Sequence, residues 1–226
     1  MTFNHGVRSS TLRRSTKTAY RSVGRFFVAQ IQNRHTAKRQ KSGTVRKIDI
    51  YIYSKQKQHK SCDTDALIIK SFGYYSEKHG IGFDENAEVL RDGGGKPHFK
   101  NGAPQIGVTH TDELVFIAFD SDNFGIDAEK AARTVKRSAE IAKKYMTQSE
   151  RAYIDNAADR NAAFLEIWVK KEAYVKYTGA GLRGISRADT DCAGLCFSRI
   201  QYKDYIIYIC AEKSVENAEI HDLRGD

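Results

Sequence analysis

Three acidic residues stand at spacings that could bring their carboxylates together. Asp127 and Glu129 lie two residues apart in an expected strand, so both side chains point to the same side of a sheet. Glu172 lies in the middle of an expected helix, with Trp168 and Lys176 one turn away on the same stripe. If that helix faces the strand, the three carboxylates converge and favour a hard cation such as Mg²⁺. The alternative is that the two strand acids are solvated and that Glu172 and Lys176 form an ordinary helical ion pair.

Two basic residues are further candidates for chemistry. Lys96 follows three glycines, which let a backbone approach an anion closely. The loop is not a Walker A loop, because Pro97 stands where Ser or Thr should hold the metal. His110 ends an apolar strand next to a turn, a position that suits contact with a ligand, although a structural role is the alternative.

Other motifs fail on their context. Residues 179–184 match GxGxxG, but they follow a helix, whereas a dinucleotide site requires a preceding strand. The chain has no GxSxG elbow and no HExxH helix. Its four cysteines show no CxxC pair and no second ligand pair at zinc-site spacing. We therefore expect them to be reduced packing residues.

The elements that must position these residues follow from periodicity and capping signals. Strands are expected at 47–53, 106–110, 114–119 and 124–129, and a closing hairpin at 194–200 and 205–211. Helices are expected at 63–79, where Asp63 or Thr64 can cap, at 131–146, in a short turn opening at 149, and at 161–177 with a stop at Gly179. The strand–helix–strands order occurs once before residue 120 and again after it. This predicts an α+β protein of two similar lobes, each a small antiparallel sheet packed with a long helix.

Charge is distributed unevenly along the chain. The net charge is +9, yet residues 1–60 hold 15 Lys/Arg against one acid, Asp49, and the remainder is mildly acidic. A DNA-binding protein with a basic working face is therefore disfavoured. Residues 1–46 contain no acid and are predicted to be a basic, disordered extension. Three interpretations of this segment compete: a dispensable tail, an organelle transit peptide, and an arm that binds nucleic acid or a membrane surface.

Taken in chain order, the motifs resemble one family, the 4′-phosphopantetheinyl transferases, particularly the two-lobed Sfp-like branch. The resemblance spans about Asp92 to Leu182 and extends more loosely to the final hairpin. It rests on Gly95-Lys96-Pro97, Val108-Thr109-His110-Thr111, Gly125-Ile126-Asp127-Ala128-Glu129, Trp168-Val169-Lys170-Lys171-Glu172-Ala173-Tyr174-Val175-Lys176 and Gly179-Ala180-Gly181-Leu182.

The resemblance implies an enzyme with a pseudo-twofold fold: an N-terminal lobe at 47–118, a C-terminal lobe at 119–226, and a metal site at the lobe interface. It implies Mg²⁺-dependent transfer of phosphopantetheine from coenzyme A (CoA) to a serine of an apo acyl or peptidyl carrier protein, with release of adenosine 3′,5′-bisphosphate. Glu172 and Lys176 would be catalytic, Glu172 accepting the serine proton directly or through a metal-bound water. The implied metal ligands are Asp127, Glu129 and Glu172, and the implied CoA contacts are Lys96, Pro97, Thr109, His110, Thr111, Lys171 and Lys176.

Departures from the family pattern leave alternatives. The arginine expected near the start of the first-lobe helix has no counterpart around Asp63–Asp65, and lysines of the basic extension are one possible substitute. Two other hypotheses are a noncatalytic relative that binds CoA or a carrier protein, and a nucleic-acid-binding protein that uses residues 1–46. No stretch approaches 18 consecutive apolar residues, and no apolar run follows Met1. We therefore expect a cytoplasmic monomer with no membrane or nucleic-acid partner.

Overall fold

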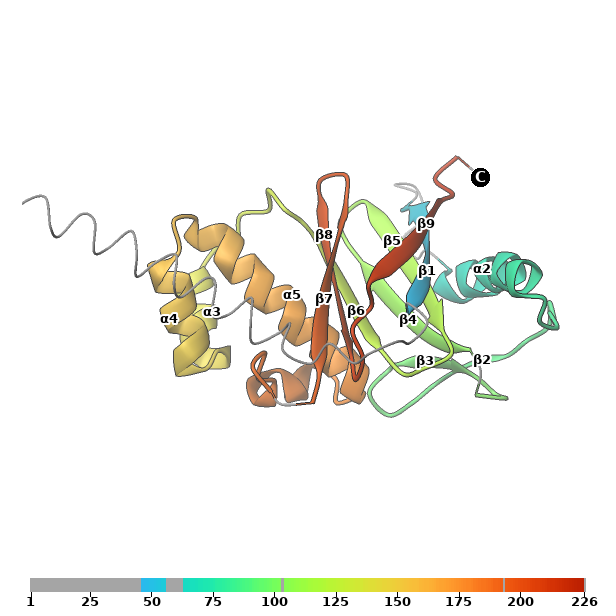
Figure 1. The fold of residues 1–226 in the computed structure, drawn as a ribbon, viewed down its shortest axis with the longest axis horizontal. Coiled ribbons are helices and arrows are strands. Elements are labelled where there is room, and N and C mark those ends of the chain that lie inside the picture. Colours follow the sequence, from blue (N-terminus) through green and yellow to red (C-terminus); the bar gives the residue numbers. More distant parts are fainter. Residues whose placement is uncertain (1–45, 56–62, 103, 193, 226) are drawn as a thin grey trace, which may run out of the picture. The chain divides into compact units, whose positions relative to one another are not determined.

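The computed structural model describes residues 46–55, 63–102, 104–192 and 194–225 (Figure 1). The basic extension, apart from Arg46, lies outside the described residues. The described part contains two sheets together with helices, which confirms the predicted α+β class. None of its helices combines the length and the apolar character needed to span a bilayer.

The larger sheet has six strands, in the order β2-β3-β4-β5-β1-β9. Helix α2 (Thr64–His79) covers one face of it and packs Ile68, Phe72 and Tyr75 against aromatic and branched side chains of the strands. The predicted cap is present, because the Asp63 carboxylate accepts a hydrogen bond from the Ala66 N–H at 3.1 Å. The strands are β1 (Lys47–Ser54), β2 (Val89–Arg91), β3 (Pro97–Phe99), β4 (Gln105–His110), β5 (Leu114–Asp120) and β9 (Asn217–Asp222).

The smaller sheet is antiparallel, in the order β6-β8-β7. Its strands are β6 (Gly125–Lys130), β7 (Cys196–Tyr202) and β8 (Tyr205–Ala211). One face packs on the larger sheet: Ile126 and Ile209 share a buried core with Ile50 and Phe116. The opposite face packs on helix α5. A layer of core side chains therefore lies on each face of the smaller sheet, in addition to the layer between α2 and the larger sheet.

Helix α5 (Arg160–Thr178) matches the strongest helix prediction. Asp159 caps its first turn by accepting from the Ala162 N–H at 2.9 Å, and Gly179 ends it in the left-handed conformation at φ 67°. Leu165, Val169 and Ala173 bury against the smaller sheet. Their spacing of four is the helical repeat that the sequence predicted.

Two shorter helices precede α5 and differ from expectation. Helix α3 (Ser138–Tyr145) begins seven residues later than predicted, because the Asn161 side chain ties the preceding segment to the start of α5 through Arg133 O at 2.8 Å and the Val135 N–H at 3.4 Å. The helical turn expected at 149 is a helix of nine residues, α4 (Gln148–Asn156). A Thr147–Glu150 capping box fixes its start.

The predicted division into lobes differs from the sheet pairing in one respect. Strand β9, from the end of the chain, pairs in parallel with β1 and so joins the sheet of the first lobe. That sheet is therefore not purely antiparallel, and the two sheets are unequal. Strand β5 also crosses the expected boundary at residue 118. Two similar lobes remain a prediction.

Candidate functional site

The two acids of β6 point toward helix α5. Ile126 and Ala128 lie in the core between the sheets, so Asp127 and Glu129 occupy the opposite face of the strand. The strand and the helix approach closely at Gly125, where an added Cβ would lie 2.0 Å from the Ala173 carbonyl oxygen. This contact places Asp127 beside the last turns of α5, which carry the remaining candidates.

Asp127 is buried and has two partners. Lys176 on α5 donates to its Oδ1 at 2.7 Å, and Thr109 on β4 donates to the same oxygen at 2.7 Å. The site therefore joins both sheets and the helix. Thr109 is buried, and its predicted contact with CoA stays a prediction. Its role in the structure is to hold the Asp127 carboxylate.

Glu172 lies one turn before Lys176 on α5. Burial and then the negative charge of Asp127 raise its pKa to about 7, while Lys176 and a hydrogen bond from Trp168 oppose the shift. Trp168 thus contacts Glu172 along the helix stripe that the sequence predicted. A carboxyl that favours protonation next to a second carboxylate shows that the local negative charge is incompletely neutralised.

The third acid, Glu129, is turned toward Arg133, which donates to its carboxylate. Asp127, Glu129 and Glu172 lie at the same interface but do not place three ligating oxygens within 4.8 Å of one another. In the described ranges, the group that does so is Asp49, Glu219 and His221, on the other sheet. Sequence reasoning missed this group, because its members come together only through the pairing of β1 with β9.

A cavity of about 300 Å³ is lined by Lys176, the partner of Asp127. The Lys96 ammonium enters it from the glycine loop and donates to Asn123 Oδ1 at 2.5 Å and to Phe124 O at 2.8 Å. Burial lowers the pKa of Lys96. The lining residues are Thr64, Arg91, Gly94, Gly95, Lys96, Pro97, Ile106, Gly107, Val108, His110, Phe124, Gly125, Val175, Lys176, Gly179 and Gly181. The cavity therefore collects four of the predicted CoA contacts: Lys96, Pro97, His110 and Lys176.

His110 lies in the same cavity beside the start of α2. Its Nε2 is 3.2 Å from the Thr64 hydroxyl oxygen. Burial lowers the pKa of His110, and the charges of Lys55 and Lys176 lower it further. The ring is therefore held neutral as a hydrogen-bonding group at neutral pH.

Arg91 is the lining residue that sequence reasoning missed. It comes from β2, and its guanidinium lies 2.5 Å from the Asp65 carboxylate in the first turn of α2. An arginine thus reaches the start of the first-lobe helix from a different element. No local signal pointed to it, since β2 has three residues and its partner lies 26 positions earlier.

Two further residues predicted to contact CoA have partners within the protein in this structure, and their contact with CoA stays a prediction. Lys171 is fully buried, with its ammonium 2.9 Å from Glu150 Oε2 and donating to the Ala188 carbonyl. Thr111 is also buried, and its hydroxyl closes the β4–β5 turn by accepting from the Leu114 N–H at 3.0 Å. Both side chains stabilise the framework around the site.

Comparison with known proteins shows which family this chain is similar to. Residues 123–218 match the model of the 4′-phosphopantetheinyl transferase superfamily. The chain is similar to 4′-phosphopantetheinyl transferase Sfp of Bacillus subtilis (strain 168), with 31% identity over 137 residues, 58% of this chain and 56% of that protein. It is also similar to 4′-phosphopantetheinyl transferase gsp of Aneurinibacillus migulanus, with 28% identity over 101 residues, 44% of this chain and 41% of that protein. The matches thus span about half the length of these curated relatives. Residues 123–218, which carry Asp127, Glu129 and Glu172, are thus similar to the 4′-phosphopantetheinyl transferase superfamily, and the similarity to Sfp supports a resemblance to the Sfp-like branch.

Proposed function

We propose that this protein transfers the 4′-phosphopantetheine group of CoA to a serine hydroxyl of an apo acyl or peptidyl carrier protein and releases adenosine 3′,5′-bisphosphate. One observation carries the proposal: Arg91, Lys96, His110 and Lys176 line one cavity, and Lys176 links it to the buried Asp127 carboxylate. The relatives' names support the same reaction, although the matches span only about half of their length.

The basic residues around the cavity suit the phosphates of CoA. Arg91, Lys96, His110 and Lys176 come from four elements or loops and line one space. Guanidinium and ammonium groups bind phosphate by charge-assisted hydrogen bonds, and a neutral imidazole can add one more donor. Lys96 and Lys176 are already held by other protein groups, so little side-chain entropy is lost when a phosphate arrives.

The acidic residues fit a divalent cation through their donor set. Asp127, Glu129 and Glu172 offer only carboxylate oxygens, which Mg²⁺ prefers, and the raised pKa of Glu172 marks an excess of negative charge that a cation would relieve. These three residues would hold the ion. Bound there, Mg²⁺ would screen the pyrophosphate oxygens and stabilise the charge of the leaving group.

Glu172 is the proposed proton acceptor for the carrier serine, directly or through a water. Its pKa of about 7 suits proton transfer near neutral pH. The serine oxygen attacks the pantetheine-side phosphorus of CoA, and the bond from that phosphorus to the bridging oxygen breaks. Lys176, beside Asp127, would place a positive charge near the departing phosphate. The serine proton moves to Glu172 and no covalent enzyme intermediate is needed.

Intact-mass spectrometry of an apo carrier protein tests the proposal. After incubation with this protein, CoA and Mg²⁺, we expect a mass gain of about 340 Da, which is one phosphopantetheine arm. The gain should disappear with EDTA. No gain on fatty-acid, polyketide and peptide-type carriers would contradict the proposed transfer, and retained CoA binding in that case would favour the noncatalytic relative.

Two variants of helix α5 sharpen this test. Glu172→Gln should lower the transfer rate by about 100-fold or more, because it removes both the proton acceptor and one metal ligand. Glu166→Gln is the matched control: it is the same substitution on the same helix, at a carboxylate that pairs with Lys170 and Tyr153. Equal rates in the two variants would remove Glu172 from the site.

We also propose that the protein is a cytoplasmic monomer.

A further inference from the structure

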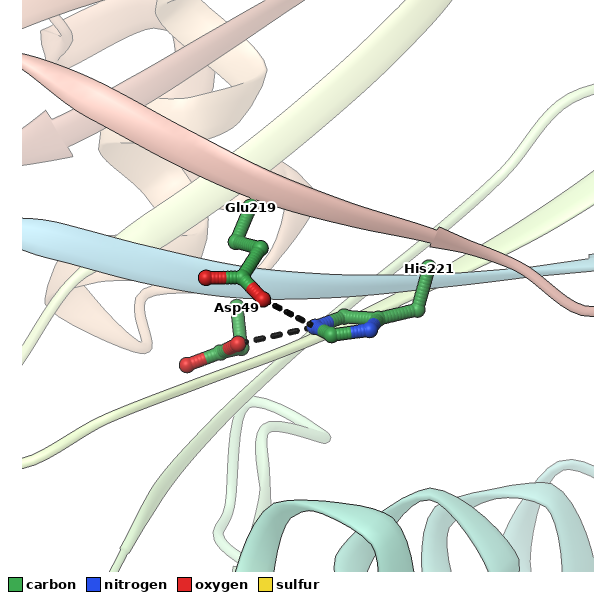
Figure 2. A group of neighbouring side chains, drawn as sticks. All are labelled: Asp49, Glu219 and His221. Carbon is green, nitrogen blue, oxygen red and sulfur yellow. Dashed lines mark hydrogen bonds and ion pairs between the residues drawn. The ribbon is translucent and has the colours of Figure 1, made fainter. Parts of the chain in front are cut away.

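A second cluster of ionisable side chains lies on the larger sheet, away from the acids of β6. Asp49 on β1 and Glu219 and His221 on β9 direct their side chains toward one another (Figure 2). The His221 Nε2 lies 2.8 Å from Asp49 Oδ1 and 3.9 Å from Glu219 Oε1. All three ligating atoms lie within 4.8 Å of one another, and nothing in the proposed reaction uses them.

The strand register creates this cluster. In the parallel pair, Asp49 stands opposite Glu219 and Tyr51 stands opposite His221. Like charges directly opposite each other destabilise a sheet, so this pairing calls for a cation between the two carboxylates. Burial of Asp49 raises its pKa, but hydrogen bonds from Lys78, His221 and His79 outweigh burial and keep the carboxylate ionised.

The spacing of the ligating atoms is close to what a small metal ion requires. With metal–ligand bonds of about 2.0 Å in a tetrahedron, neighbouring ligand atoms lie about 3.3 Å apart. The two separations measured from His221, 2.8 Å and 3.9 Å, lie on either side of that value. One imidazole nitrogen and two carboxylate oxygens suit zinc-class ions better than Mg²⁺ or Ca²⁺.

The cluster already attracts a cation. The Lys78 ammonium donates to Asp49 and lies 2.7 Å from Glu219 Oε2, between the two carboxylates. The Lys78 side chain is one-third exposed on a flexible stem, so it can swing into solvent when a doubly charged ion arrives. The Lys78 ammonium therefore occupies the position that a metal ion would take, and it competes with the metal ion for the two carboxylates.

Neighbouring groups hold the ligands in place. His79 Nε2 lies 2.9 Å from the second oxygen of Asp49 and orients the carboxylate. The His221 ring stacks on Tyr51, with ring centroids 4.5 Å apart. The Tyr51 hydroxyl is buried and has no hydrogen-bond partner among the described residues, which leaves an unused polar group on the side chain that supports the imidazole.

We propose that Asp49, Glu219 and His221 form a site for a divalent transition-metal ion of the zinc class, which displaces the Lys78 ammonium and ties the last strand to β1. The site is independent of the proposed transferase reaction. Water would complete the coordination, because three protein ligands leave a position open.

Metal binding to the full chain tests the proposal, with Zn²⁺ followed by calorimetry and Co²⁺ by its visible absorption. In a large excess of Mg²⁺, which competes at the β6 acids, one saturable equivalent should bind at micromolar metal. His221→Gln and Glu219→Gln should each weaken binding by about tenfold or more, and Lys78→Met should tighten it by a similar factor because the competing cation is gone. His98→Gln on β3 is the matched histidine control and should bind as the parent protein does.

Several outcomes would overturn the site. They are the absence of a saturable equivalent, unchanged binding in both His221→Gln and Glu219→Gln, or weaker binding in Lys78→Met, which would mean that Lys78 serves only as a structural ion pair. Because the Glu219 side chain is 54% exposed, we expect Glu219→Gln to fold, and this variant still tests the site if His221→Gln fails to fold. Asp127→Asn should leave zinc binding unchanged, and loss of binding there would place the ion at the β6 acids instead.

Discussion

At Glu172, burial and the charge of Asp127 act in the same direction and both favour the protonated carboxyl. The native state therefore binds this proton more tightly than the unfolded chain does. The resulting stabilisation is fully present below the ordinary pKa of 4.5 and is lost as the pH rises through about 7. The Glu172 carboxylate thus lowers the stability of the fold at neutral pH.

Glu172→Gln should remove this pH dependence. In EDTA, we expect the variant to be more stable than the parent protein at pH 8.5 by about 2 kcal/mol and nearly equal to it at pH 4.5. Melting temperatures across this pH range would measure the difference. Parallel profiles for the two proteins would show that Glu172 titrates normally, and Glu166→Gln controls for loss of charge on the same helix.

Thr109 offers a second test at the scale of one hydroxyl. Thr109→Val keeps the shape but removes the donor to Asp127, so we expect a loss of about 1–2 kcal/mol in the free energy of unfolding. If Asp127 holds Mg²⁺, the Mg²⁺ concentration for half-maximal transfer should also rise, since the carboxylate loses its orienting partner. Thr109→Ser should restore both quantities. A stable variant with an unchanged Mg²⁺ requirement would limit Thr109 to packing.

At the scale of elements, one buried ion pair fixes helix α4, helix α5 and the segment that follows α5. Glu150 accepts from the Thr147 N–H and from the Thr190 N–H and hydroxyl, while Lys171 reaches both Glu150 and Ala188. Every polar atom of the pair therefore has a partner, which is the condition for burying two charges. The pair also fixes the rotation of α5, and with it the direction of the neighbouring Glu172.

Breaking this pair from one side should be more costly than removing it. Glu150→Gln leaves a buried ammonium, and we expect it to lower the free energy of unfolding by about 3 kcal/mol. Adding Lys171→Met should recover part of that loss, because no unpaired charge remains. Urea unfolding of the single and double variants would measure the coupling. Losses that simply add in the double variant would mean that the two side chains do not stabilise each other.

At the scale of the whole molecule, the last strand completes the first sheet. Strand β9 pairs with β1 over Lys47–Ile52 and packs Ala218 and Ile220 on the core between the sheets. Without β9, β1 would become the edge strand of the larger sheet, and its backbone N–H and C=O groups on that side would lack partners. Strand β9 therefore covers this edge of β1.

Deleting residues 217–226 should destabilise the protein by on the order of 3 kcal/mol or more, through lost hydrogen bonds and exposed apolar side chains. A drop in melting temperature together with aggregation would be the expected result. Deleting only residues 224–226, which follow the strand, is the control and should leave the melting temperature within a few degrees of the parent. A full deletion that melts like the control would show that β9 is dispensable.

What the sequence determined by itself is local. Alternation placed Asp127 and Glu129 on one face of β6, and helical spacing placed Trp168, Glu172 and Lys176 on one stripe of α5. The helix caps at Asp63 and Gly179 could also be predicted from the sequence, because all these features depend on neighbours within one or two turns. The same local reasoning brought Lys96 and His110 into consideration.

The partner of each polar side chain, in contrast, depends on the tertiary structure. Lys171 is as basic as Lys176, yet one is buried against Glu150 and the other contacts Asp127. Arg91 reaches Asp65 across 26 positions, and His221 reaches Asp49 across 172. Nothing near these residues in the chain specifies such contacts. They arise when packing of the apolar faces brings distant strands and helices together, and burial then requires each charge to find a partner.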